Sequence, residues 1–220
     1  MLPKLPGALI SAEGSGARLS ALRFVLCYRG GNNLSREAFE KVKIGVIADT
    51  HIPDLIPALP PRIEEVFRGL DIILHVGDVC RLDILQQLEN SFTITMAVAG
   101  ERDSSETKRY LEEKKVVKFA NRSIGMIHGH HYKEQLTRWA SIKRRLRGES
   151  PQEGLYRYIL DQFEGVDCVV FGHTHHPYIK VRNGVLLFNP GAVAPTPGMR
   201  PSVGILDVDE RTITGRIVHL

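Results

Sequence analysis

Five apolar segments of this chain each run into residues that can bind a metal ion. They span residues 44–51, 72–78, 94–103, 124–130 and 166–176, and Asp, Glu or His follows the last apolar position of each. Short, continuous apolar runs rich in β-branched residues predict buried strands. In an open α/β sheet, ligands bind outside the carboxyl ends of the strands, so we expect these five loops to converge on one site.

The last of the five segments carries the most distinctive pair of polar residues. The apolar run ends at Phe171, Gly172 interrupts it, and His173 and His175 follow with one residue between them. Imidazole nitrogen is a good ligand for zinc, iron, manganese or nickel. Taken alone, a His-x-His pair is also typical of solvated loop histidines. The four other segments favour the metal site.

In chain order, the motifs are D-x-H at 49–51, G-D at 77–78, G-x-x-D at 100–103, H-G-H at 128–130 and G-H-T-H at 172–175. This order resembles the calcineurin-like metallophosphoesterase superfamily. The H-G-H form, the short chain and Asn189-Pro190-Gly191 are similar to its small YfcE-type phosphodiesterase branch. The resemblance covers about residues 42–218. It implies a four-layer αββα sandwich, in which helices flank two mixed β-sheets.

The resemblance also implies a dinuclear metal site. Two divalent cations about 3.5–4 Å apart would clamp a phosphoryl group and hold a hydroxide for in-line attack on a phosphodiester. The implied ligands are Asp49, His51 and His175 for the first metal, His128, His173 and Glu101 for the second, and Asp78 as the bridge. Mn²⁺ is the expected metal, with Ni²⁺, Fe²⁺ and Zn²⁺ as alternatives. The structural alternative for each carboxylate is a loop-capping role.

Residues 101 and 102 depart from the family pattern. Most members read G-N-x-D, whereas this chain reads Gly100-Glu101-Arg102-Asp103. Glu101 can still bind a metal, but its charge should repel an anionic substrate more than Asn would. Many members carry a proton-donating His where Arg102 stands, and a guanidinium does not release its proton. Arg102 therefore either clamps a phosphate oxygen or pairs with Asp103.

His130 is expected on the substrate side of the site, or behind His128 as the group that orients it. Together with Arg102 and Asp103, it completes the candidate catalytic residues. Because no strong general acid is evident, substrates with good leaving groups should be favoured. His75 lies inside an apolar segment, where a buried structural or orienting histidine is expected.

The composition predicts a single domain. A chain of 220 residues with 43% hydrophobic content can bury a full core. We expect residues 42–220 to form the metallophosphoesterase domain and residues 1–41 to be an irregular extension, with a transit peptide as the alternative. Three cysteines without C-x-x-C spacing predict free thiols and a cytoplasmic location. No apolar run approaches the roughly 18 residues of a membrane span, so no membrane partner is expected.

The net charge of +4 is concentrated in residues 1–41 and in the basic segment 132–147. Because the basicity is local, a nucleic-acid partner is not expected. Segment 132–147 is either a solvated helix face or a lid that attracts a polyanionic substrate. The expected substrate is a small phosphate ester, with a nucleotide as one candidate. The sequence leaves the oligomeric state open, with a homodimer as one candidate.

The sequence also predicts the main elements outside the five motif segments. Helices are expected over residues 61–70 and 81–89, and another should begin at a capping box over residues 150–153. A strand is expected at 116–119, and hairpins over 178–188, across Asn183-Gly184, and over 202–218.

A scaffold without hydrolytic activity is the alternative function. The retromer complex contains a subunit of this fold with a similar D-x-H-I-P start. Loss of ligand histidines would be the mark of such a scaffold. In this chain His51, His128, His173 and His175 are all present, which favours the enzyme. Only residues 101 and 102 favour the scaffold.

Overall fold

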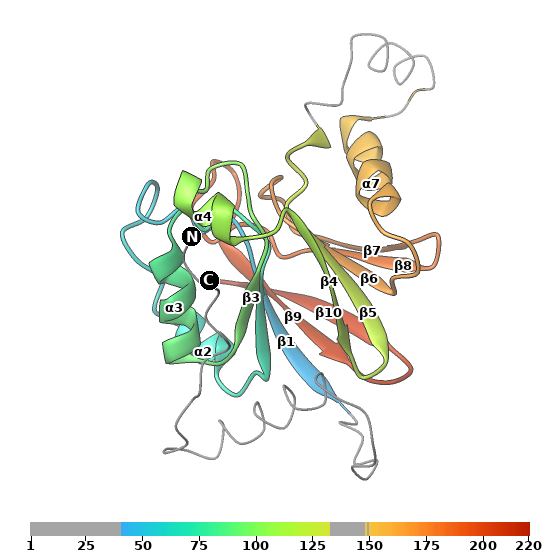
Figure 1. Ribbon diagram of the computed structural model, residues 1–220, viewed down its shortest axis with the longest axis horizontal. Helices are drawn as coiled ribbons and strands as arrows, with labels where there is room; N and C mark the ends of the chain where they lie inside the picture. Colours follow the sequence, from blue (N-terminus) through green and yellow to red (C-terminus); the bar gives the residue numbers. More distant parts are fainter. Residues whose placement is uncertain (1–40, 133–147, 149) are drawn as a thin grey trace, which may run out of the picture. The chain divides into compact units, whose positions relative to one another are not determined.

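The computed structural model describes residues 41–132, 148 and 150–220, which form two five-stranded β-sheets with flanking helices (Figure 1). The strand order is β10-β9-β1-β2-β3 in the first sheet and β4-β5-β6-β8-β7 in the second. Each sheet contains both parallel and antiparallel pairs. The predicted sandwich of two mixed sheets with flanking helices is therefore confirmed.

The first sheet consists of β1 (Val42–Ile47), β2 (Ile72–His75), β3 (Thr95–Ala97), β9 (Ser202–Val208) and β10 (Ile213–His219). The second consists of β4 (Lys114–Phe119), β5 (Arg122–Ile127), β6 (Cys168–Phe171), β7 (Tyr178–Arg182) and β8 (Val185–Asn189). The helices are α2 (Arg62–Phe67), α3 (Leu82–Ser91), α4 (Ser105–Tyr110) and α7 (Pro151–Asp161). The five motif segments thus contain β1, β2, β3, β5 and β6, as expected.

Helix α2 covers the first sheet through the apolar face that the sequence predicted. Ile63 and Phe67 are buried against Ile47 of β1 and Ile73 of β2. The helix ends at Phe67, earlier than expected, and Gly69 follows with a φ of +75°. A glycine in the left-handed region is the usual way in which a helix stops.

Helix α7 covers the second sheet and begins where the sequence predicted. The Ser150 side chain accepts a hydrogen bond from the backbone N–H of Glu153, and Pro151 occupies the first turn. Leu155 and Ile159 then pack with the buried residues of β5, β6 and β8. The cap and the apolar stripe together determine where this helix starts and which face it buries.

The two sheets pack closely because two glycines face a phenylalanine. A Cβ atom added to Gly204 of β9 would meet the Phe188 ring at 2.3 Å, and one added to Gly215 of β10 would meet it at 2.6 Å. The Phe188 side chain, on β8, is fully buried. The interface between the sheets thus depends on the absence of a side chain at both positions.

Helix α4 and strand β3 also differ from the prediction. Helix α4 was not expected in its charged segment, where Ser104 caps it by accepting a hydrogen bond from the Thr107 backbone. Strand β3 spans only Thr95–Ala97 and is therefore much shorter than the motif segment 94–103 that contains it. Because β3 is at the edge of its sheet, it pairs with β2 alone among the described strands. The expectations for residues 1–40 and 133–147 lie outside the described residues.

The free-thiol prediction is confirmed for Cys80 and Cys168, which are buried and unbridged. Cys27 lies outside the described residues. None of the described helices has both the length and the apolar content needed to cross a membrane.

The carboxyl ends of the motif strands meet where the two sheets approach each other. Within the first sheet, the Asp49 N–H donates to the Gly77 carbonyl at 3.1 Å. Between the sheets, the His173 N–H donates to Asp49 Oδ2 at 3.1 Å. These hydrogen bonds join the loops after β1, β2 and β6, so the fold brings the polar ends of the strands together.

Candidate metal centre

The loops at this junction have unusual backbone conformations. Nine described residues other than glycine have a positive φ, and five of them are predicted metal ligands. These five are Asp49, His51, Asp78, His173 and His175, with φ between +47° and +67°. Left-handed backbone is uncommon for such residues and tends to cluster at functional sites. The left-handed backbone at these five positions directs several of the predicted ligand side chains into one small volume.

Asp49, His51 and His175 form the first group of potential ligands, called group 1 below. Their ligand atoms lie within 4.8 Å of one another. His175 Nε2 is 3.4 Å from Asp49 Oδ1 and 3.3 Å from His51 Nε2. Asp49 and His51 are at most 1% exposed. One metal ion can therefore be reached by all three side chains.

Asp49, Asp78 and His128 form the second group, called group 2, with the same 4.8 Å limit. His128 Nε2 is 3.3 Å from Asp78 Oδ2 and 3.9 Å from Asp49 Oδ1. Asp78 Oδ2 is also 3.6 Å from His51 Nε2. Both carboxylates thus lie between the two groups, whereas the sequence predicted this position only for Asp78.

The chemistry of these atoms fits a bound cation. Asp49 Oδ1 and His128 Nε2 are buried and have no hydrogen-bond partner among the described residues. Each such atom costs about 1–3 kcal/mol when it stays unpaired. Two buried carboxylates side by side also require a compensating positive charge. Mixed oxygen and nitrogen ligands suit divalent ions such as Mn²⁺, Fe²⁺ or Zn²⁺.

Hydrogen bonds orient the histidine rings. His128 Nδ1 is 2.8 Å from the Val76 carbonyl oxygen. Because a carbonyl can only accept, Nδ1 carries a proton, and Nε2 is the atom that faces the carboxylates and can bind a cation once it has released its own proton. His175 Nδ1 lies 2.7 Å from Thr196 Oγ1, and His51 Nδ1 lies 4.0 Å from Cys80 Sγ. These contacts leave Nε2 as the inward-facing atom of each ring.

The two groups differ in their electrostatics without metal. Burial lowers the pKa of His128, but the nearby carboxylates of Asp78, at 3.3 Å, and Asp49, at 3.9 Å, outweigh it and raise that pKa to about 9. Burial raises the pKa of Asp78, but the contact with His128 is stronger and holds it well below its usual range. In group 1, burial lowers the pKa of His51 despite the nearby carboxylates. The contact with Asp49 raises the pKa of His175 in the same group, so a proton competes with a cation in both groups.

His173 and Glu101 lie beside each other, outside the two close groups found among the described residues. His173 Nδ1 is 3.7 Å from Glu101 Oε2. The Glu101 side chain is 54% exposed. Five of the seven predicted ligands are thus brought together directly, while these two are at the border of the site.

Asp103 and Arg102 are arranged differently from the predicted ion pair. Asp103 is buried, and its two carboxylate oxygens accept the backbone N–H groups of Cys80 and Gly100, each at 2.7 Å. No ion pair in the described part of the chain joins it to Arg102. The Arg102 backbone N–H donates to Asp78 Oδ1 at 2.7 Å, and residue 102 is exposed. Asp103 therefore ties the loop after β2 to the loop after β3.

His130 lies next to the groups, with its ring centroid 5.3 Å from His128 and 6.4 Å from His173. Burial and the neighbouring His128 lower its pKa to about 4, which keeps the imidazole neutral near pH 7. His75 is fully buried in β2, with Nε2 3.2 Å from Thr50 Oγ1. Thr50 separates Asp49 from His51, so the placement of His75 agrees with the predicted buried, orienting histidine.

Asn189, which the sequence indicated only as part of a family motif, has a structural role at the site. This buried side chain donates to the Gly172 carbonyl at 2.9 Å and to Thr174 Oγ1 at 3.1 Å, and accepts from the Gly191 N–H at 2.9 Å. It therefore anchors the loop that carries His173 and His175. The Asn-Pro-Gly sequence is a turn signal that could have indicated such an anchor.

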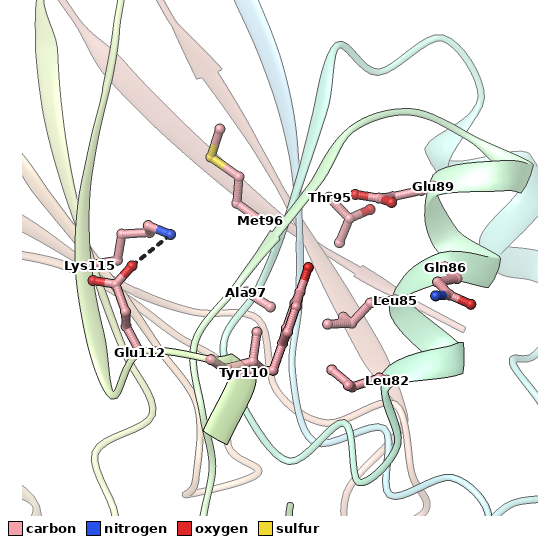
Figure 2. A pocket seen from close by; sticks show the side chains of 11 residues that line it. Leu82, Leu85, Gln86, Glu89, Thr95, Met96, Ala97, Tyr110, Glu112 and Lys115 are labelled. Carbon is pink, nitrogen blue, oxygen red and sulfur yellow. Dashed lines mark ion pairs between the residues drawn. The ribbon is translucent and has the colours of Figure 1, made fainter. Parts of the chain in front are cut away.

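A separate hollow of about 420 Å³ lies beside the edge strand β3 (Figure 2). Leu85 of α3, Ala97 of β3 and Tyr110 of α4 line it, and the ion pair of Glu112 with Lys115 closes one side at 2.9 Å. None of its lining residues is a predicted ligand, so this hollow is distinct from the metal centre.

Comparisons with known proteins agree with this geometry. The family model described as the calcineurin-like phosphoesterase superfamily domain matches residues 42–211. A probable metallophosphoesterase of Methanothermobacter thermautotrophicus is 32% identical over 179 residues, which cover 80% of this chain and 91% of that protein. A phosphodiesterase of Methanocaldococcus jannaschii is 27% identical over 183 residues, covering 77% and 95%.

Among solved structures, vacuolar protein sorting 29 of Cryptosporidium parvum superposes with a TM-score of 0.63 at 23% identity, covering 82% of this chain and 92% of that one. This likeness supports the fold alone. The family is shown by the match of the family model over most of the chain, together with the 32% identity to the Methanothermobacter protein. The chain belongs to the calcineurin-like phosphoesterase superfamily.

Proposed function

We propose that this protein hydrolyses phosphodiesters and holds two divalent metal ions between its two sheets. The observation that carries the proposal is the pair of buried atoms, Asp49 Oδ1 and His128 Nε2, that face other ligand atoms without a hydrogen-bond partner in the described part of the chain. A protein core tolerates such an arrangement when a cation completes it.

In this proposal, Asp49, His51 and His175 would hold one ion and His128 the other, with Asp78 shared between the two. His173 and Glu101 would complete the second set. The exposed Glu101 side chain lies close to His173, which makes this addition feasible. Metal ions, when bound here, would neutralise phosphoryl oxygens and lower the pKa of water.

The surrounding side chains would bind and orient the ester. Arg102 can hold a phosphate oxygen through paired N–H donors, because its guanidinium is always charged. His130 can donate a hydrogen bond to the leaving oxygen from its neutral ring. Because the pKa of His130 is about 4, its ring is rarely protonated near pH 7 and is seldom available as a general acid, so esters with good leaving groups should react fastest.

The decisive experiment measures hydrolysis of a chromogenic phosphodiester and a phosphomonoester with Mn²⁺, before and after chelation. We expect diester hydrolysis that chelation abolishes and Mn²⁺ restores. Tyr110→Phe, in the separate hollow beside β3, serves as a control that should keep full activity. A protein that binds two Mn²⁺ ions and hydrolyses neither ester would refute the proposal.

The second candidate is a scaffold with this fold and no hydrolysis. Glu101 and Arg102 favour it, because both residues depart from the family pattern and are exposed. Glu101→Asn combined with Arg102→His separates the two readings. If the natural protein is inactive and the double variant hydrolyses the diester, the natural residues have silenced the site and the scaffold is supported.

Several finer expectations stay predictions. They are manganese as the native metal, a nucleotide as the substrate, a homodimer as the assembly, and a cytoplasmic location. Metal analysis of the purified protein and sedimentation analysis test the first and third directly.

A further inference from the structure

His175 is the proposed ligand histidine that the fold packs least tightly. Its side chain is 22% exposed, compared with 12% for His173, 1% for His51 and 0% for His128. A buried ring is held in place by its neighbours, whereas a ring at the surface can rotate. The orientation of His175 therefore depends more strongly on its hydrogen bonds.

A threonine outside every motif makes that hydrogen bond. Thr196 Oγ1 is 2.7 Å from His175 Nδ1. On the opposite side of the ring, His175 Nε2 faces Asp49 Oδ1 at 3.4 Å and His51 Nε2 at 3.3 Å. The threonine hydroxyl and the metal-facing atoms thus lie on opposite sides of the same ring.

Two turn residues keep Thr196 in place. The chain reads Thr196-Pro197-Gly198-Met199, the Met199 N–H donates to the Thr196 carbonyl at 2.9 Å, and Gly198 has a φ of +78°. Proline in the second position and a positive-φ glycine in the third are typical of a type II turn. The residue at the first position of such a turn has little backbone freedom.

The rest of this loop is tied to the metal centre. The Ala194 N–H donates to the Asp49 carbonyl at 3.1 Å, and the Val193 N–H donates to the Ala48 carbonyl at 3.2 Å. At the far end, the Ser202 hydroxyl donates to the Pro190 carbonyl at 2.7 Å. The loop that presents Thr196 is therefore fixed to the same strand end that presents Asp49.

The position of the proton on His175 decides whether the ring can bind a metal. A neutral imidazole carries its single proton on either Nδ1 or Nε2. When Nδ1 donates to Thr196 Oγ1, Nε2 keeps its lone pair toward Asp49. In the other tautomer, the proton occupies the position that a cation needs.

A hydroxyl can donate or accept. We infer that the Thr196 hydroxyl accepts from His175 Nδ1, and that Thr196 is thereby a positioning residue that orients the ring, favours its metal-binding tautomer and strengthens cation binding at group 1. This inference rests on the proposed function for its metal-binding part. Thr196 acts through His175 and touches neither Asp78 nor His128, so group 2 should be unaffected.

The test compares Thr196→Val, which keeps the shape of the side chain and removes its hydroxyl, with Thr196→Ser, which keeps the hydroxyl. Thr212→Val is the matched control, because it removes an exposed threonine hydroxyl that bonds Asp209 at 3.0 Å in the turn between β9 and β10. Thermal unfolding of each variant verifies that it is folded, and Thr196→Ala provides a second removal of the hydroxyl.

The first measurement is the tautomer of His175 in the metal-free protein, read from the imidazole ¹⁵N chemical shifts at a pH high enough for the ring to be neutral, because the contact with Asp49 raises the pKa of His175. The second is a titration with Mn²⁺ that resolves two dissociation constants. We expect Thr196→Val to lose the Nδ1-protonated form of His175. We also expect one Mn²⁺ dissociation constant to rise by about 10-fold, which is the lower end of the effect of removing a ligand's hydrogen-bond partner, because water can reach this ring. Thr196→Ser and Thr212→Val should match the natural protein in both measurements.

An unchanged tautomer in folded Thr196→Val and Thr196→Ala would overturn the inference. Equal weakening of both constants would also overturn it, because that result indicates a general structural effect. If the natural protein binds no pair of ions, the proposed function fails, whereas the tautomer measurement still decides the role of Thr196.

Discussion

Group 1 and group 2 of the metal centre differ in how completely the fold prepares them. In group 1, Asp49, His51 and His175 already converge, and the pKa of His51 is lowered toward the neutral, metal-binding form. In group 2, His128 holds a proton against Asp78, and Glu101 remains at the exposed border. A proton competes with a cation in both groups, because the pKa of His175 is raised as well, and group 2 additionally depends on the movement of the Glu101 side chain.

The largest expected effect comes from removing a shared carboxylate. Asp78→Asn should lower diester hydrolysis more than 100-fold, since losing only a hydrogen-bond partner of a ligand costs about 10–100-fold. It should also raise both Mn²⁺ dissociation constants, because Asp78 Oδ2 lies between His51 and His128. Asp83→Asn, at an exposed position on α3, is the control and should have no effect. Loss of only one ion in Asp78→Asn would show that the two groups do not share this carboxylate.

Metal removal should produce the next largest effect. At a free ion concentration of about 100 times the dissociation constant, binding stabilises the folded protein by about 2.7 kcal/mol. For a domain of this size, chelation should lower the melting temperature by about 5–10 °C. Differential scanning calorimetry at rising Mn²⁺ concentrations measures this. A melting temperature independent of Mn²⁺ would mean that the buried carboxylates are stabilised without a cation.

The pH dependence of the metal-free protein should separate His128 from the buried neutral histidines His75 and His130. The folded pKa of His128 is about 9, above the usual 6.5, so its stabilising contribution is complete below pH 6.5 and is lost as pH rises through 9. His75 and His130 have folded pKa values of about 4, so their contributions are present above pH 6.5 and are lost as pH falls toward 4. Denaturant unfolding of the chelated protein should therefore show greatest stability near pH 6.5.

A His128→Gln variant sharpens that measurement. It should remove the decline in stability between pH 6.5 and 9, which amounts to at most about 1.4 kcal/mol per pH unit for one proton. The decline on the acid side should persist in this variant. If the free energy of unfolding declines above pH 6.5 in this variant as it does in the natural protein, then the proton that the folded state retains in this range is bound to a group other than His128.

The smallest expected effect concerns Glu101→Asn. Because Glu101 is exposed and solvent screens its charge, we expect the dissociation constant of the more weakly bound Mn²⁺ ion to rise by about 10-fold or less. The KM of an anionic diester should fall, since a negative charge beside the substrate is removed. Steady-state kinetics at saturating Mn²⁺ measures both changes, with Glu106→Asn on α4 as the control. A rise in the KM would show that the Glu101 side chain assists substrate binding.

By itself, the sequence determined the strands and the chemistry at their ends. The apolar runs before Asp49, Asp78, His128 and His173 predicted buried strands, and the Ser150-Pro151 start predicted α7. These signals are local, because hydrophobic period and capping act over a few residues. For the same reason, the motifs indicated the resemblance to the family before any contact was known.

Only the tertiary structure decided how these residues meet. Three features of the site depend on loops that are distant in sequence. Asp49 is shared by both groups, Asp103 accepts two backbone N–H groups, and Thr196 contacts His175. The edge position of β3 and the packing of Phe188 against two glycines are likewise set by neighbours from elsewhere in the chain. The physical reason is that a side chain's partners and burial follow from which surfaces pack together, and local sequence pattern does not specify that choice.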